Sequence, residues 1–126
     1  MSKNYYITTK DAAFMFDYMK DAEIDFENRR FGIHVAQTVG RLAPILQVHP
    51  EFSTWDELTG YLIGNEEHIT IFDEYEAKVS VAEFLDTIKC DKANNPSRRS
   101  VFKEMVYDER YYMDDRGYEW CKVEFS

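Results

Sequence analysis

The sequence predicts one α+β domain over residues 1–126, in which three to four helices pack on one face of a small antiparallel sheet. The sheet is expected to consist of an N-terminal strand, a central strand and a C-terminal hairpin. Strand-like segments lie at both ends of the chain, segments with helical spacing lie between them, and no linker or repeat divides them. A chain of 126 residues with 44% apolar residues suits one hydrophobic core.

The first third of the chain is predicted to hold one strand and two helices. Tyr5–Thr8 is rich in aromatic and β-branched residues and favours a strand. Thr9–Lys20 has apolar residues three and four positions apart, which indicates an amphipathic helix. His34–Val48 is expected to form a central helix kinked by Gly40 and Pro44, although its first turn also fits the alternation of a strand.

The middle of the chain contains the clearest signals for helix ends. A short helix is expected over Thr54–Ile63, ending at Gly64, because an oxygen-bearing cap precedes an acidic first turn. His68–Phe72 is predicted to be a strand. Ser80–Glu83 is a capping box that begins another helix, and Asp91–Ser100 collects residues typical of a loop.

The C-terminal segment is predicted to form an antiparallel hairpin. Tyr111–Met113 and Tyr118–Phe125 flank Asp114–Gly117, a turn sequence with glycine at the left-handed position. The preceding segment, Val101–Tyr107, fits either a strand or a helix.

The charge balance excludes several classes of partner. The chain has 24 acidic and 15 basic residues, a formal charge of -9 that repels phosphate backbones and anionic lipids. Direct binding to nucleic acid or to membranes is therefore not expected. The N-terminus has no apolar run typical of a signal peptide, and no segment is apolar over a membrane-spanning length. A cytoplasmic location is predicted.

No motif for catalysis, a metal or a cofactor is recognisable. His34, His49 and His68 lack the spacing of metal ligands, and Cys90 and Cys121 are expected to be reduced thiols without a redox motif. Nucleophile signatures and phosphate-binding glycine loops are missing. A non-enzymatic protein is therefore expected. A small hydrolase that uses scattered carboxylates or His34 is a weaker alternative.

The most specific feature is an acidic stretch from Leu42 to Ala77, which contains eight acids and no lysine or arginine. Such a stretch leaves a strongly negative surface unless folding brings distant cations, such as Arg29, Arg41, Arg98 or Arg99, beside it. A merely soluble acidic face is the plain interpretation. The sharper hypothesis is that carboxylates spaced like phosphates occupy the basic cleft of a protein that handles nucleic acid.

These observations predict a protein that inhibits or regulates a basic, nucleic-acid-handling partner, as a mimic of DNA. In size and charge the chain is similar to phage anti-restriction and anti-CRISPR proteins and to immunity proteins for nuclease toxins, a likeness of composition that covers no motif. The predicted interface consists of acids with two tyrosines as aromatic anchors: Glu51, Asp56, Glu57, Tyr61, Glu66, Glu67, Asp73, Glu74, Tyr75 and Glu76. The alternative is an assembly protein that forms a homo-oligomer through its C-terminal hairpin.

Overall fold

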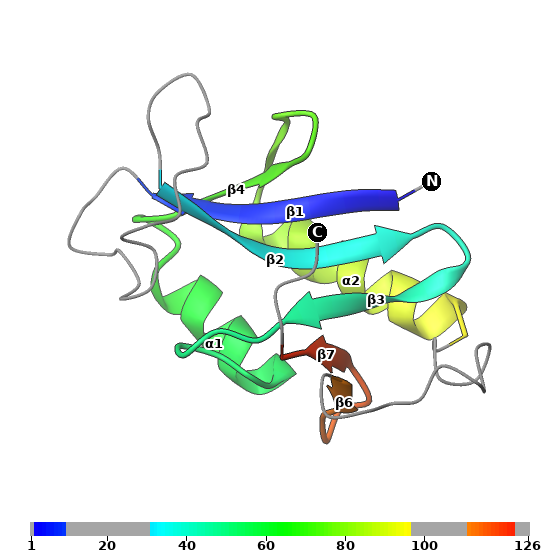
Figure 1. Cartoon of the computed structure of the whole chain (residues 1–126). Helices are drawn as coiled ribbons and strands as arrows, with labels where there is room; N and C mark the ends of the chain where they lie inside the picture. Colours follow the sequence, from blue (N-terminus) through cyan, green and yellow to red (C-terminus); the bar gives the residue numbers. More distant parts are fainter. Residues whose placement is uncertain (1, 10–30, 97–110, 123–126) are drawn as a thin grey trace.

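The structure is a computed structural model of the chain, and it describes residues 2–9, 31–96 and 111–122. Within these residues the chain forms seven strands and two helices (Figure 1). In chain order they are β1 (Ser2–Thr9), β2 (Phe31–Val39), β3 (Leu42–Gln47), α1 (Trp55–Gly64), β4 (Thr70–Asp73), β5 (Lys78–Val79), α2 (Val81–Asn94), β6 (Tyr111–Met113) and β7 (Glu119–Cys121).

The strands form one mixed sheet in the order β5-β4-β1-β2-β3-β7-β6. Neighbouring strands are antiparallel, except that β7 runs parallel to β3. The prediction of a small antiparallel sheet with three to four helices is therefore wrong, because the described residues give a seven-stranded mixed sheet and two helices. The fold is still α+β in kind.

The predicted central helix over His34–Val48 is also wrong, because this segment forms the hairpin of β2 and β3. The alternating, β-branched start of the segment prevails over its helical spacing, and Gly40 and Arg41 make the turn. Pro44 lies where the pairing register shifts, so its missing N–H interrupts no regular ladder position.

Three local predictions are confirmed. Thr54 caps α1, which ends at Gly64, and the Ser80 hydroxyl accepts a hydrogen bond from the Glu83 N–H at the start of α2. The terminal hairpin turns through Gly117, whose φ of 81° suits glycine.

Two predicted elements have other bounds in the structure. The predicted strand His68–Phe72 is shifted, since β4 is Thr70–Asp73. Helix α2 continues to Asn94, into the predicted loop.

Two predictions concern residues outside the described part of the chain. Of the expected helix Thr9–Lys20, the structure describes only Thr9, which is the last residue of β1. The segment Val101–Tyr107 likewise lies outside the described residues.

One hydrophobic core joins the two helices to the sheet. Figure 1 shows α2 behind β1, β2 and β3, with α1 beside the end of β3. The Tyr5 ring meets the Phe84 ring edge-on at 5.3 Å, which ties β1 to α2. The most deeply buried side chains of this core are Ile7, Val35, Leu46, Phe52, Leu58, Leu62, Ile71, Phe84, Ile88 and Trp120. Each buries enough apolar surface to contribute about 1.5–3 kcal/mol.

His49 is the buried histidine of this arrangement and makes the stability depend on pH. Its Nε2 donates to the His34 carbonyl at 2.6 Å, and burial lowers its pKa from 6.5 to about 4. Below pH 6.5 the unfolded chain therefore takes up a proton that the folded chain refuses. Stability is lost as the pH falls from 6.5 to about 4, by roughly 3 kcal/mol in all.

We predict that His49→Gln, which keeps a donor near the His34 carbonyl, removes most of this loss of stability on acidification. The measurement is urea denaturation at several values between pH 7 and pH 5, with His68→Gln at an exposed histidine as the matched control. The control should keep the slope of the wild-type protein. An unchanged slope in His49→Gln would contradict the assignment to His49.

Candidate interaction surface

The structure distributes the ten predicted interface residues over three places. Glu51, Asp56, Glu57 and Tyr61 lie in or before α1, Glu66 and Glu67 follow its C-terminus, and Asp73, Glu74, Tyr75 and Glu76 form the turn between β4 and β5. Since a helix rises 1.5 Å per residue, the ends of α1 are about 15 Å apart. The predicted residues therefore do not form one compact cluster.

The acids at the start of α1 are explained by the helix itself. Thr54 Oγ1 accepts a hydrogen bond from the Glu57 N–H at 3.2 Å, and the Glu57 carboxylate accepts from the Ser53 N–H and hydroxyl at 3.0 and 2.9 Å. The hydrogen bonds from Ser53, chiefly from its hydroxyl, lower the pKa of Glu57. Asp56 and Glu57 also lie at the positive end of the helix dipole, which favours carboxylates.

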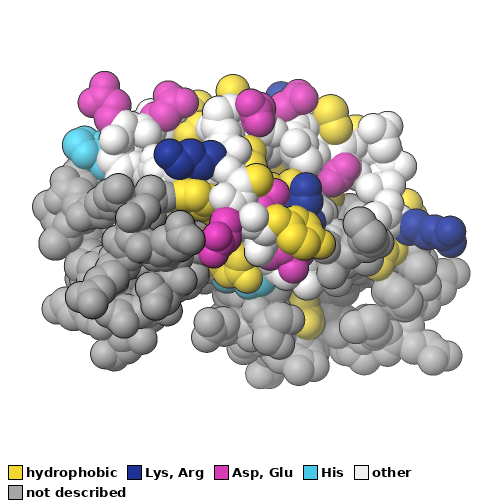
Figure 2. Space-filling view, turned by 90° about the horizontal axis from the view of Figure 1, so that it is seen from above, with side chains coloured by type: hydrophobic (Ala, Val, Ile, Leu, Met, Phe, Trp, Pro, Cys, Tyr) yellow, Lys and Arg dark blue, Asp and Glu magenta, His cyan; other side chains and the backbone are white. Residues whose placement is uncertain are grey.

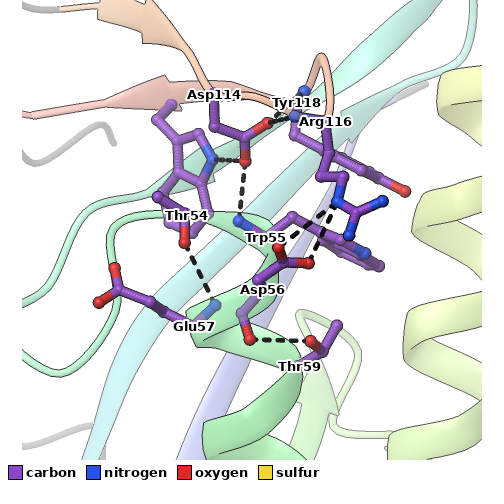
Figure 3. A network of polar contacts seen from close by, with 9 residues as sticks. Thr54, Trp55, Asp56, Glu57, Thr59, Asp114, Arg116 and Tyr118 are labelled. Carbon is purple, nitrogen blue, oxygen red and sulfur yellow. Dashed lines mark hydrogen bonds and ion pairs between the residues drawn. The ribbon is translucent and has the colours of Figure 1, made fainter.

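A carboxylate of the terminal hairpin holds this end of α1 in place (Figure 3). Asp114 Oδ2 accepts from the Trp55 N–H at 2.7 Å and from Trp120 Nε1 at 2.8 Å. Its other oxygen accepts from the N–H groups of Arg116 and Tyr118 at 2.9 and 3.0 Å. The Trp55 and Tyr118 rings stack at 4.1 Å, so polar and aromatic contacts together fasten the hairpin to α1.

Asp56 has a cation beside it. Arg116, in the hairpin turn, has its Nε 3.3 Å from the Asp56 Oδ1 (Figure 3). Both side chains are about two-thirds exposed, so the pair contributes little to stability. The pair does reduce the negative charge at the N-terminal end of α1.

Two of the predicted residues at α1 belong largely to the packing of the protein. Tyr61 is half-buried, and its ring lies 5.4 Å from the ring of Phe52. Burial, helped by the charge of Glu51, raises the pKa of Tyr61 above its ordinary value. Glu51 is half-buried as well. Neither side chain presents most of its surface to a partner.

Glu66 and Glu67 differ from the acids at the N-terminal end of α1 because neither helix capping nor the helix dipole favours a carboxylate at their positions. Both are exposed just beyond the C-terminus of α1, where the dipole disfavours negative charge by about 0.3–1 kcal/mol per group. The last turn of α1 contains no basic residue, and no cation among the described residues lies within ion-pair distance of either carboxylate. Their charges are uncompensated there.

In the turn between β4 and β5, Asp73 is structural and its neighbours are exposed. The buried Asp73 carboxylate accepts from the N–H groups of Tyr75 and Ala77 at 2.9 and 3.0 Å, and Lys3 Nζ lies 3.8 Å away. Glu74 accepts from the Asn4 N–H at 3.0 Å. The Tyr75 side chain is 66% exposed. Asp73 thus shapes the turn that presents Glu74, Tyr75 and Glu76.

Glu76 occupies a backbone conformation that suits glycine. Its φ is 65°, which is unusual for a residue with a side chain and costs about 1 kcal/mol. The Glu76 carboxylate makes no ion pair with a described residue. The turn therefore carries an exposed charge at a strained position, and the Glu76 N–H closes the turn by donating to the Asp73 carbonyl at 3.0 Å.

The exposed carboxylates that remain are those of Asp56, Glu57, Glu66, Glu67, Glu74 and Glu76, which we call the acidic surface. Figure 2 shows the molecule from the β1 and β4 side, with acidic side chains along one margin and in the centre. Lysine and arginine side chains lie between them in this view. On the face seen in Figure 2 the acids are interrupted by cations. Of the acidic surface itself, Asp56 has Arg116 beside it among the described residues, while Lys3 pairs with Asp73.

Ile63 was not among the interface residues predicted from the sequence, although its spacing gives a signal. Trp55, Leu58 and Leu62 form the buried side of α1, and Ile63 lies outside this series. Its side chain is 62% exposed. An apolar side chain thus lies beside Glu66 and Glu67 on the outside of the molecule.

Comparison of the chain with protein-family models, with curated proteins and with solved structures finds no match. In the described part of the chain, neither helix is long and apolar enough to cross a bilayer. Nor do the described His, Cys, Asp and Glu side chains gather in a group of three or more that could hold a metal ion.

We predict that Asp114→Ala destabilises the protein by about 2–4 kcal/mol, because it leaves the Trp55 N–H and the Trp120 indole N–H without their acceptor. Chemical denaturation followed by tryptophan fluorescence measures this effect at both tryptophans of the chain. The matched control is Asp115→Ala at the exposed neighbour, which should change stability by less than about 0.5 kcal/mol. Equal losses in the two variants would refute the role of Asp114.

We predict that Glu76→Gly stabilises the protein by about 1 kcal/mol, because glycine adopts a positive φ without strain. Glu76→Gln removes the same charge and keeps the strain, so it should leave the free energy of unfolding within about 0.5 kcal/mol of the original. Thermal and urea denaturation of the two variants separate strain from charge. A similar gain in both would assign the effect to charge.

Proposed function

We propose that the protein is a non-enzymatic binding protein that acts in the cytoplasm on a basic protein partner. Its acidic surface enters a cleft that the partner uses for nucleic acid, and binding inhibits or regulates that partner. Direct contact with nucleic acid or lipid has no role, because the charge of -9 repels both.

The observation that carries this proposal is the pair Glu66 and Glu67. Both carboxylates are exposed at the negative end of α1, and no cation of the described residues compensates them. Within the protein they oppose the helix dipole, so their contribution to folding is unfavourable. A cationic partner would reverse the sign of this contribution, and the same charges would steer its approach.

The other exposed carboxylates support the proposal to different degrees. Glu76 carries its charge at a strained position, and Glu74 lies two residues before it. Asp56 and Glu57 are explained by the helix start and by Arg116, so they support it less. Asp73 is buried in its turn and is left out of the proposed contact.

Assembly through the C-terminal hairpin has less support in the described residues. β7 lies between β3 and β6, so its hydrogen-bonding sides over residues 119–121 are already used. A second copy would have to pair with the three-residue β6 or the two-residue β5. Edges this short offer few main-chain bonds to a partner strand.

We predict that affinity capture from the native host, with mass spectrometry, retains a basic protein at about 50 mM salt and releases it at about 500 mM, where charges are screened. The purified partner should lose binding to its nucleic acid when the protein is added. Glu66→Gln/Glu67→Gln should weaken the complex by at least about fivefold.

The control for this experiment is Asp86→Asn/Asp115→Asn, which removes the same number of charges from exposed sites on α2 and the hairpin. This variant should bind as the original protein does. A captured partner that is acidic, that persists at high salt or that does not handle nucleic acid would rule out the proposal.

A further inference from the structure

The exposed side of α1 carries Asp56, Glu57, Gly60, Ile63 and Gly64. Its C-terminal part, which we call the outer face, consists of Gly60, Ile63 and Gly64, three and four residues apart and therefore on one side of the helix. All three are exposed, and Ile63 is 62% exposed. Toward the C-terminus this face adjoins Glu66 and Glu67. An apolar contact point is thus surrounded by bare backbone and bordered by carboxylates that no cation in the described part of the chain compensates.

No packing contact inside the described protein requires glycine at position 60 or 64. A Cβ at Gly60 or at Gly64 would meet no atom within 4 Å, so no neighbour requires the space. Gly64 is still helical, has no positive φ and precedes the C-cap Asn65. Glycine within a helix costs about 0.5–1 kcal/mol relative to alanine. The bare backbone becomes useful only when something outside approaches α1 closely.

The chemistry of this face restricts the occupant. Nucleic acid is repelled by Glu66 and Glu67, and an evenly basic, extended chain would leave Ile63 uncovered. A helix with a stripe of apolar and small residues covers Ile63 and approaches the two glycines closely. Lysine or arginine at the edges of that stripe reaches the carboxylates.

We propose that the outer face of α1 is the docking surface for an amphipathic basic helix of the partner protein. This inference rests on the proposed function and deepens it by naming the element of contact and the partner's secondary structure. Ile63 supplies the apolar anchor, Gly60 and Gly64 allow close approach, and Glu66 and Glu67 select cationic helices over others.

The test uses two synthetic peptides with the same lysine, leucine and alanine content. One is arranged as an amphipathic helix, and the other is scrambled so that its leucines form no stripe. Titration into the ¹⁵N-labelled full chain should shift amide signals of residues 60–67 with the amphipathic peptide. The scrambled peptide should bind at least about fivefold more weakly, a difference of about 1 kcal/mol.

Variants of α1 give the decisive readout. Ile63→Gln removes the apolar anchor. Gly60→Gln places a side chain where a partner helix would approach the backbone, and it improves helix propensity, so the chain stays folded. Each should weaken the amphipathic peptide by at least about fivefold. Ala93→Gln, at an exposed position of α2, should bind as the original chain does.

The outcomes separate this inference from the proposed function. Equal affinity for the two peptides, no binding at about 1 mM, or insensitivity to both α1 variants overturns the docking surface. Shifts confined to residues 74–76 overturn it as well, while a salt-dependent basic partner in the capture experiment leaves the proposed function standing. Failure to capture such a partner would instead remove the function on which the inference rests.

Discussion

The carboxylate of Asp114 is the contact on which the placement of α1 depends. One of its oxygens receives the first N–H of α1 and the indole N–H of the fully buried Trp120, and the other closes the hairpin turn. Ionised acceptors make hydrogen bonds about twice as strong as neutral ones. Because β7 pairs with β3, this one side chain connects the helix, the hairpin and the centre of the sheet.

Signals confined to a few neighbouring residues could be read from the sequence. The caps at Thr54 and Ser80 and the glycine turn at Gly117 each depend on contacts within four residues. The structure of the segment from His34 to Val48 could not be read in this way, because its apolar residues fit both the spacing of a helix and the alternation of a strand. Pairing with β1 and β7, which lie far away in the chain, decided between them. Tertiary context overrode local spacing there.

The candidate surface was predictable only in part for the same reason. The sequence shows eight acids without a cation between Leu42 and Ala77, but Lys3 and Arg116 come from outside this stretch to Asp73 and Asp56. Asp73 is buried because its carboxylate shapes the β4–β5 turn, and no motif in the sequence predicted this turn. Position in the sequence thus identified the charged segment but not which of its charges remain exposed.

The residues that break local rules are what distinguish this surface from an ordinary acidic one. Asp56 and Glu57 follow the helix dipole, whereas Glu66 and Glu67 oppose it. Gly60 and Gly64 each cost up to about 1 kcal/mol although no described neighbour needs the space, a notable sum in a protein of ordinary stability. Such costs concentrate where function requires them. Their grouping at the end of α1 therefore argues for binding there more strongly than net charge does.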